Sequence, residues 1–165
     1  MKGNIKNNIW KLYAISGLTM FLVIMPTITL FLEENGLSFQ EIMLLQAIFS
    51  FSLVMFEIPS GYFADKFQRK TSIIIGCILA FLANLLYSFA SNFSSFAVAE
   101  ILLGLGISFI SGTDSAIAYD TLLQLKQEDH FTKVRSKMTS VGNFAEGFAA
   151  ILGGFLAIYS LRSTA

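Results

Sequence analysis

The sequence predicts an all-α membrane protein with five transmembrane helices. Of its 165 residues, 55% are hydrophobic and only 13% are charged, whereas charged residues make up about a quarter of a soluble domain. The charges fall in short stretches that separate apolar segments of roughly 20 residues, which is the length that crosses a bilayer as a helix. The expected spans are 12–32, 41–62, 71–90, 96–118 and 138–159.

The first of these segments, 12–32, follows several lysines, a pattern that is also typical of a secretory signal peptide. It is longer than the apolar core of a signal peptide, and Glu33-Glu34-Asn35 follows it instead of a small-residue cleavage site. We therefore expect an uncleaved membrane helix. Pro26 removes a backbone N–H donor near its middle, so we expect a kink there.

The connections between the spans are short and polar. Asn35-Gly36 is a turn signal between the first two spans, and 91–95 joins the third span to the fourth. The longest connection, 119–137, is charged and long enough to hold an interfacial helix.

Basic residues alternate along these connections and predict the orientation. All lysines and arginines except Arg162 lie at the N-terminus or in the connections after the second and fourth spans. We therefore expect a multi-pass protein of the cell inner (plasma) membrane with a cytoplasmic N-terminus. The residues expected on the cytoplasmic side are Lys2, Lys6, Lys11, Lys66, Arg69, Lys70, Lys126, Lys133, Arg135 and Lys137.

Polar side chains inside the spans are candidates for proton or substrate binding, because a polar group in hydrocarbon usually faces a protein interior or a water-filled cavity. Glu146 is the deepest carboxylate, with roughly 12 Å of helical rise between it and the start of its span. It suits either a proton carrier or a structural hydrogen bond to a neighbouring helix. For the carboxylates nearer the span ends, interfacial anchoring is the alternative. The candidates are Glu57, Glu100, Asp114, Asn143 and Glu146.

The segment 61–70, between the second and third spans, carries the most specific pattern. Asp65 lies at the end of one helix, where a carboxylate can cap a neighbouring helix or pair with a cation. A charge cluster at this face would form in one conformation and separate in another, as a conformational latch. The alternative is that the basic residues only follow the positive-inside rule. The expected latch residues are Gly61, Asp65, Lys66, Arg69, Lys70 and Asp120.

This segment resembles the cytoplasmic signature of the major facilitator superfamily, G-x-x-x-D-(R/K)-x-G-(R/K)-(R/K). Weaker similarities follow in the expected order at 56–61, 103–112, 119–122 and 145–154. The resemblance implies a transporter of two six-helix halves with substrate bound between them, of which this chain is the N-terminal portion. Helices 1 and 4 would line the cavity, helices 2 and 5 would pack against the missing half, and the latch would hold the outward-facing state.

Three positions depart from the family pattern. Gln68 stands where the signature has its second glycine, so a turn that needs a positive φ would cost about 1 kcal/mol there. Glu100 stands where the family often has arginine. The proline of the antiporter signature is absent from 149–154.

We expect transport of a small-molecule substrate by a secondary, proton-coupled transporter, present here as a truncated N-terminal part. Its partners would be the lipid bilayer and the missing C-terminal half or a partner chain; a fragment, a truncated gene product and a functional half all fit. The alternative is a non-transporting membrane fragment or an interaction partner of another membrane protein. With no catalytic dyad or metal-ligand spacing, we expect no enzyme, catalytic residue, metal or cofactor, and zero net charge gives no basis for nucleic-acid binding.

Overall fold

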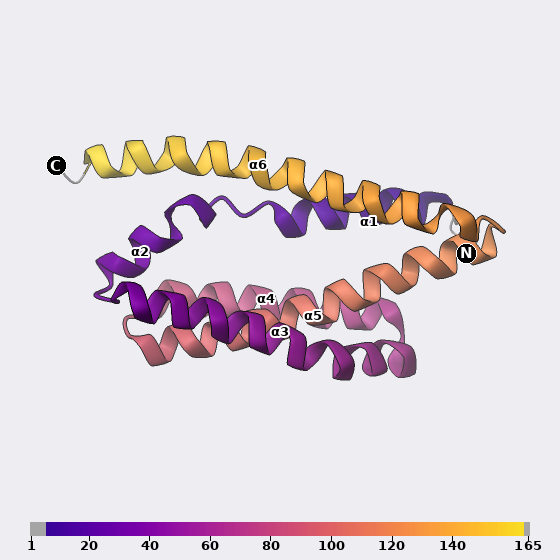
Figure 1. Cartoon of the computed structure of the whole chain (residues 1–165), viewed down its shortest axis with the longest axis horizontal. Helices are drawn as coiled ribbons and strands as arrows, with labels where there is room; N and C mark the ends of the chain where they lie inside the picture. Colours follow the sequence, from indigo (N-terminus) through magenta and orange to yellow (C-terminus); the bar gives the residue numbers. More distant parts are fainter. Residues whose placement is uncertain (1–5, 164–165) are drawn as a thin grey trace. The chain divides into compact units, whose positions relative to one another are not determined.

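The computed structural model describes residues 6–163, and this part of the chain is helical without strands, which confirms the predicted all-α class. Lys2 lies outside the described residues, and so do the side chains of Lys6 and Arg162. Figure 1 shows the order of the elements. They are α1 (Lys6–Met20), η1 (Met25–Thr27), α2 (Ile28–Glu34), α3 (Phe39–Phe67), α4 (Arg69–Phe89), α5 (Phe93–Gln124), η2 (Glu128–His130) and α6 (Phe131–Ser163).

Five stretches within the described residues are long and apolar enough to cross a membrane, as the sequence predicts. They are Asn7–Glu34, Phe39–Phe67, Arg69–Phe89, Phe93–Gln124 and Glu128–Ala157. Most of them extend beyond the apolar segments, because polar residues at the membrane surface continue the helical hydrogen bonding.

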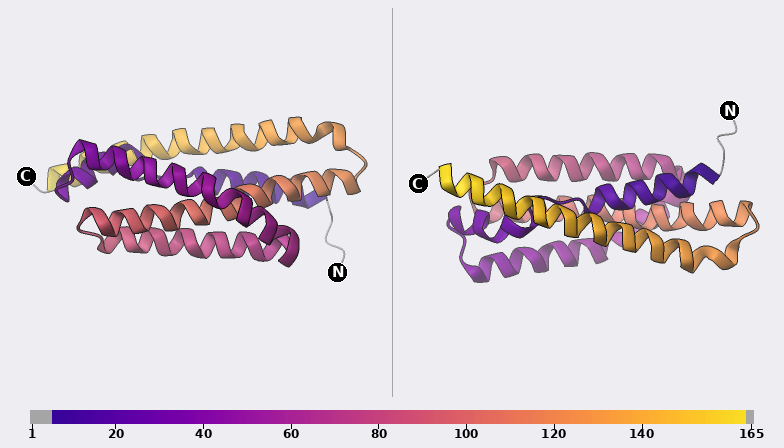
Figure 2. Two further views of the ribbon diagram at one scale, coloured as in Figure 1. Left: turned by 60° about the horizontal axis from the view of Figure 1, so that its bottom comes forward. Right: turned by 90° about the horizontal axis from the view of Figure 1, so that it is seen from above.

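The helices form two compact units. One comprises residues 1–31 and 117–165, and we call it the α1/α6 unit; the other comprises 32–116, and we call it the α3–α5 unit. In Figures 1 and 2, α6 runs alongside α1, and α3, α4 and α5 lie side by side. Helix α5 is continuous and contributes to both units.

Small residues bring the three helices of the α3–α5 unit into close contact. A Cβ atom on Gly76 of α4 would lie 2.7 Å from the backbone oxygen of Gly106 in α5. A Cβ atom on Gly104 would lie 2.9 Å from Cβ of Ser52 and 3.0 Å from the backbone oxygen of Phe49, both in α3. Such contacts let helix backbones approach closely where there is no hydrophobic driving force between helices.

Hydroxyl groups connect the same three helices. Ser60 of α3 donates a hydrogen bond from Oγ to the backbone oxygen of Ser108 in α5 (3.1 Å). Thr113 of α5 donates from Oγ1 to Oγ of Ser72 in α4 (3.0 Å). All four side chains are buried, so the bonds satisfy polar groups that lipid cannot.

The α1/α6 unit contains a smaller cluster of buried residues, formed by Leu12, Tyr13, Ala118 and Met138. Ser16 of α1 donates a hydrogen bond to the backbone oxygen of Met138 in α6 (2.8 Å). One turn further along α6, a Cβ atom on Gly142 would lie 3.1 Å from Met20 Cγ. Packing of α1 on α6 thus depends on a short row of contacts.

The first span, predicted as a helix over 12–32 with a kink at Pro26, is interrupted. Helix α1 ends at Met20, residues 21–24 are not helical, and one turn of η1 precedes α2. The predicted kink at Pro26 is therefore a full break. The ring of a helical proline collides with the carbonyl of the residue four positions earlier, which here is Leu22, inside the unwound segment.

The connection between α5 and α6 also differs from the prediction. Residues 119–137 contain no separate interfacial helix; α5 continues to Gln124, α6 begins at Phe131, and only the single turn η2 lies between them. Lys126 turns the chain with a positive φ of 55°. The polar residues of this segment form the ends of the two long helices.

Candidate functional site

The connection between α3 and α4 is a single residue, Gln68. Its backbone has φ 119° and ψ 127°, a conformation that side-chain-bearing residues rarely adopt. The positive φ is what a glycine at this position of the signature would supply without strain. Asp65 and Lys66 accordingly lie on the last turn of α3, and Arg69 and Lys70 on the first turn of α4. The position of Asp65 at a helix end agrees with the prediction, and the connection is shorter than the predicted gap between the spans 41–62 and 71–90.

Two of the predicted latch residues meet across this connection. Nη2 of Arg69 lies 3.5 Å from Oδ1 of Asp65. Nζ of Lys66 lies 5.9 Å from the ring centre of Tyr62 and 5.7 Å from that of Phe67. Asp65 and Lys66 are exposed, and the ion pair of this cluster is Arg69–Asp65.

Gly61, Lys66 and Lys70, the other latch residues of the α3–α5 unit, are not members of this ion pair. Lys70 is exposed. A Cβ atom on Gly61 would meet nothing within 4 Å, so no contact of the described chain requires glycine there. Asp120 belongs to the α1/α6 unit, and its participation in the latch stays a prediction.

The candidate polar residues inside the spans divide by burial. Glu100 is 4% exposed and Asp114 is 8% exposed, whereas Glu57, Asn143 and Glu146 are exposed. Glu146 is the deepest carboxylate along its span, yet it lies on an open face of α6. Depth along a helix therefore does not predict burial among helices.

Glu100 has a hydrogen-bond partner that the sequence did not predict. The hydroxyl of Tyr87 in α4 donates a hydrogen bond to Oε1 of Glu100 in α5 (2.5 Å). The ring of Phe96 packs against the Tyr87 ring with 5.4 Å between the ring centres. A signal for this pair was available, because a tyrosine hydroxyl at the end of an apolar helix needs a partner and the tight α4–α5 turn returns the chain beside it.

Asp114 accepts a hydrogen bond from the neighbouring Ser115 hydroxyl (3.1 Å, to Oδ1). The next residue along α5 on its other side, Thr113, bonds to Ser72 of α4. Asp114 is thus buried and accepts a hydrogen bond from Ser115, next to a residue that joins α5 to α4.

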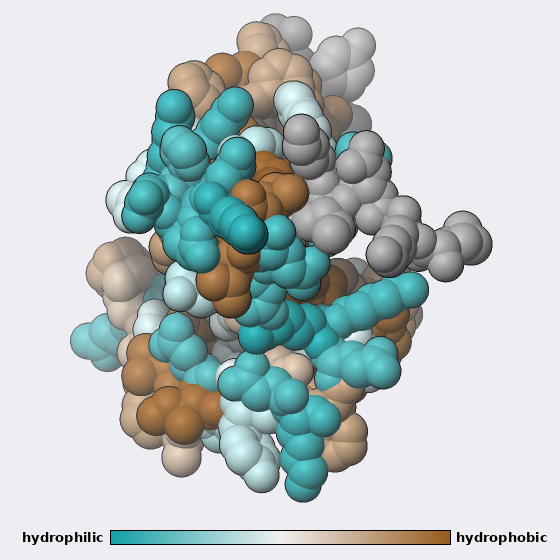
Figure 3. Space-filling view, turned by 90° about the vertical axis from the view of Figure 1, so that its right-hand side faces the viewer, coloured by the Kyte–Doolittle hydropathy of each residue, from teal (hydrophilic) through white to brown (hydrophobic). Residues whose placement is uncertain are grey.

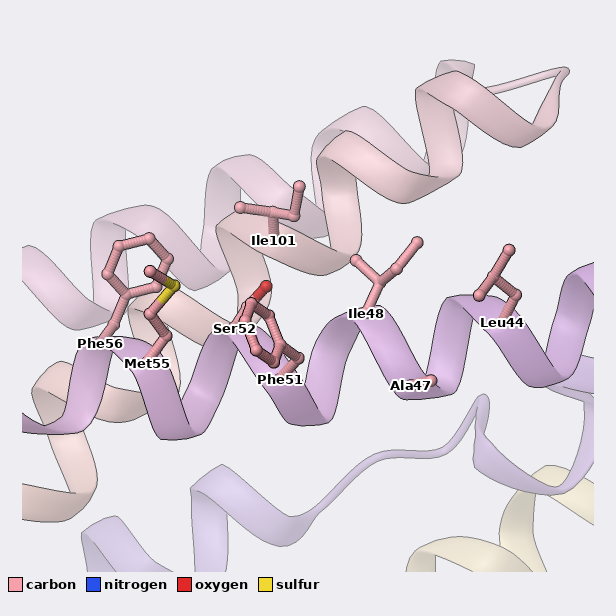
Figure 4. A pocket seen from close by; sticks show the side chains of 8 residues that line it. All are labelled: Leu44, Ala47, Ile48, Phe51, Ser52, Met55, Phe56 and Ile101. Carbon is pink, nitrogen blue, oxygen red and sulfur yellow. The ribbon is translucent and has the colours of Figure 1, made fainter.

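An apolar groove of about 540 Å³ runs along α3 where it faces α5 (Figure 4). Ser52 is the polar member of its lining, and Ile101 is the member from α5. The lining residues are Leu44, Ala47, Ile48, Phe51, Ser52, Met55, Phe56 and Ile101.

Comparison with known proteins gives one family and several named relatives. A family model described as Major Facilitator Superfamily matches residues 9–165. The chain is similar to the uncharacterized MFS-type transporter YxaM of Bacillus subtilis (strain 168), with 29% identity over 143 residues, 82% of this chain and 34% of the relative. It is also similar to Multidrug resistance protein 2 of the same strain, with 29% identity over 149 residues, 90% of this chain and 36% of the relative.

A third similarity is to Quinolone resistance protein NorA of Staphylococcus aureus (strain MRSA252), with 24% identity over 140 residues, 85% of this chain and 35% of the relative. The chain spans about a third of the length of the curated relatives it matches.

Proposed function

This chain belongs to the major facilitator superfamily, which consists of transporters and not enzymes, and we propose that it forms the N-terminal part of a secondary transporter that couples a small solute to protons. The observation that carries the proposal is the match of the family model over residues 9–165, together with five helices suited to cross a membrane. The multi-pass membrane location follows from the same two findings. Coupling, solute and orientation belong to the proposal.

The proposed orientation has the N-terminus and the α3–α4 and α5–α6 connections in the cytoplasm of the cell, at the inner membrane. Basic residues concentrate in these segments, as the positive-inside rule requires. The face of the protein drawn in Figure 3 carries many hydrophilic side chains.

The proposed latch consists of Gly61, Asp65, Lys66, Arg69, Lys70 and Asp120. The Arg69–Asp65 pair supports it, because the pair spans the α3–α4 connection. This connection is the single residue Gln68, whose backbone is strained. The open space at Gly61 also supports it, since it leaves the backbone accessible to a helix of the second half. Exchange of partners between two conformations would then alternate access to the solute site.

The proposed solute has a large apolar surface. The names of two relatives, a multidrug resistance protein and a quinolone resistance protein, support this class, and so does the apolar lining of the groove along α3. Glu57, Asp114, Asn143 and Glu146 are the proposed polar contacts for solute or proton. Glu146 and Asn143 share one exposed face of α6, where they can meet a water-filled cavity.

The test uses the full-length native polypeptide in liposomes that contain a pH-sensitive dye. Adding ethidium, an apolar cation, should dissipate an imposed pH gradient, and collapsing the gradient with nigericin should abolish ethidium movement. Glu146→Gln should uncouple the two fluxes, whereas Glu34→Gln, at the last residue of the first span, should not. Ethidium movement that ignores the gradient would refute the coupling, and no movement of any apolar solute would favour a non-transporting interaction partner.

A further inference from the structure

We propose that Tyr87 and Glu100 form a proton-binding site inside the α3–α5 unit, at the end of the bundle opposite the α3–α4 connection. This inference rests on the proposed function, because a proton-coupled transporter needs a group that takes up and releases a proton. It adds a second proton-binding group, inside the α3–α5 unit, to the exposed Glu146 of the proposed function.

Glu100 is buried in the protein, and its partner Tyr87 is half-buried. Glu100 is 4% exposed, and its Oε1 accepts the hydrogen bond from Tyr87 (2.5 Å). Phe96, which packs against the tyrosine ring, is completely buried. The carboxyl group therefore accepts a hydrogen bond from Tyr87, whose ring is held by the buried Phe96.

Basic side chains are remote from the pair in this unit. The chain has no lysine, arginine or histidine in 12–65 or in 71–125, so the basic residues of the unit all lie at the α3–α4 connection. Along α4, Lys70 and Tyr87 are separated by about 25 Å of helical rise. A charged Glu100 would have no cation of this unit to balance it.

The acidic groups on the three packed helices also leave Glu100 isolated. On α3, Glu41 is held at the helix start by the Ser38 backbone nitrogen and hydroxyl (2.8 and 2.7 Å), and the other charged residues lie in the half nearer the connection. α4 carries no acidic residue, and its charged residues are Arg69 and Lys70 at its start. On α5, Asp114 lies about 20 Å of helical rise further along.

These surroundings define two states of the pair. With a proton on Glu100, the carboxylic acid is neutral and still accepts the Tyr87 hydrogen bond. When that proton leaves for water, the carboxylate keeps the same donor, and the bond becomes charge-assisted and stronger. Tyr87 keeps its own proton throughout. A buried carboxylate without a cation is costly in a membrane, so the single strong donor is what makes the ionised state accessible.

The experiment records infrared difference spectra of the full-length polypeptide in detergent as the pH is changed. A carbonyl stretching band of a protonated, buried carboxyl group should appear as the pH falls. The band should be lost in Glu100→Gln and kept in Glu146→Gln. Tyr87→Phe should keep the band and move its midpoint to higher pH, because the ionised form loses its donor.

Size-exclusion elution of each variant at the native position establishes that it is folded, and Tyr87→Phe serves as the conservative change if Glu100→Gln does not fold. A band that persists in Glu100→Gln, or a midpoint that Tyr87→Phe leaves unchanged, would overturn the site and leave the pair as a structural hydrogen bond. If the band titrates as expected while ethidium movement ignores the pH gradient, the site stands and the proposed coupling fails.

Discussion

Three helices pack on one another in the α3–α5 unit, whereas in the α1/α6 unit the interrupted first span packs on α6, and the end of α5 contributes to the same buried cluster. The first unit joins its helices with backbone contacts at Gly76, Gly104 and Gly106 and with buried hydroxyl bonds between helices. The second depends on the Ser16–Met138 bond and on glycines of α6. The comparison teaches that a helix packed between two neighbours is held in place by close contacts of its backbone. A helix packed on one neighbour leaves most of its surface available for contacts outside its own unit.

The surface of α6 shows this most clearly. One face carries large apolar side chains that are exposed, namely Phe144, Phe148, Ile151 and Phe155. Another face carries Asn143 and Glu146, also exposed. In a membrane the first face suits lipid and the second suits a cavity or another helix, so α6 presents two different surfaces for contacts outside its own unit.

The largest loss of stability is expected from Gly106→Ala, which tests the packing of the α3–α5 unit. Its Cβ atom would lie 2.8 Å from the backbone nitrogen of Ala80 and 2.9 Å from the backbone oxygen of Gly76, and neither rigid helix can yield. We expect a loss of roughly 1–3 kcal/mol, seen as a lower thermal unfolding midpoint of the full-length polypeptide. Gly112→Ala on the same helix is the matched control, since its Cβ would meet nothing within 4 Å. Equal midpoints for the two variants would contradict the tight packing of α4 on α5.

Gly153→Ala probes the weaker unit. Its Cβ atom would overlap the backbone oxygen of Val23, in the unwound part of the first span. We expect a smaller loss than for Gly106→Ala, on the order of 1 kcal/mol, because a non-helical segment can shift where a helix cannot. The neighbouring Gly154→Ala has open space and should unfold like the native protein. A loss larger than that of Gly106→Ala would reverse the ranking of the two units.

The connections of the two units can be compared by placing glycine at their strained positions. Gln68→Gly should stabilise the protein by up to about 1 kcal/mol, because glycine adopts φ 119° without steric conflict. Lys126→Gly, at φ 55°, should gain less, since residues with side chains reach that region more readily. Thermal unfolding of both variants decides the order; a destabilised Gln68→Gly would show that the backbone there is not strained.

The smallest effect on stability is expected from Asp65→Asn. Asp65 is 70% exposed in its pair with Arg69, and exposed ion pairs contribute less than about 1 kcal/mol and weaken with salt. The unfolding midpoint should therefore change little, while transport by the full-length protein should fall strongly if Asp65 belongs to the latch. Transport at the native rate in this variant would remove Asp65 from the proposed mechanism.

The number of spans could be predicted from the sequence because charge-free segments of bilayer length leave little choice. The break at 21–24 could not, since Pro26 indicates a disturbance but not how far the helix unwinds. The sequence offered Tyr87 as a partner for Glu100, but it could not predict that Glu100 is buried and Glu146 exposed. Helical periodicity assigns a side chain to a face, whereas only the packing of α3, α4 and α5 decides which face is covered.

The one-residue connection at Gln68 has a mechanical consequence. A single residue spans at most about 3.6 Å, so α3 and α4 have no slack between them at this end. A tilt of either helix should therefore displace the adjoining end of the other, and we expect α3 and α4 to move together as one hairpin. Inserting a few flexible residues into this connection should keep the side chains of α3 and α4 and let the two helices move independently.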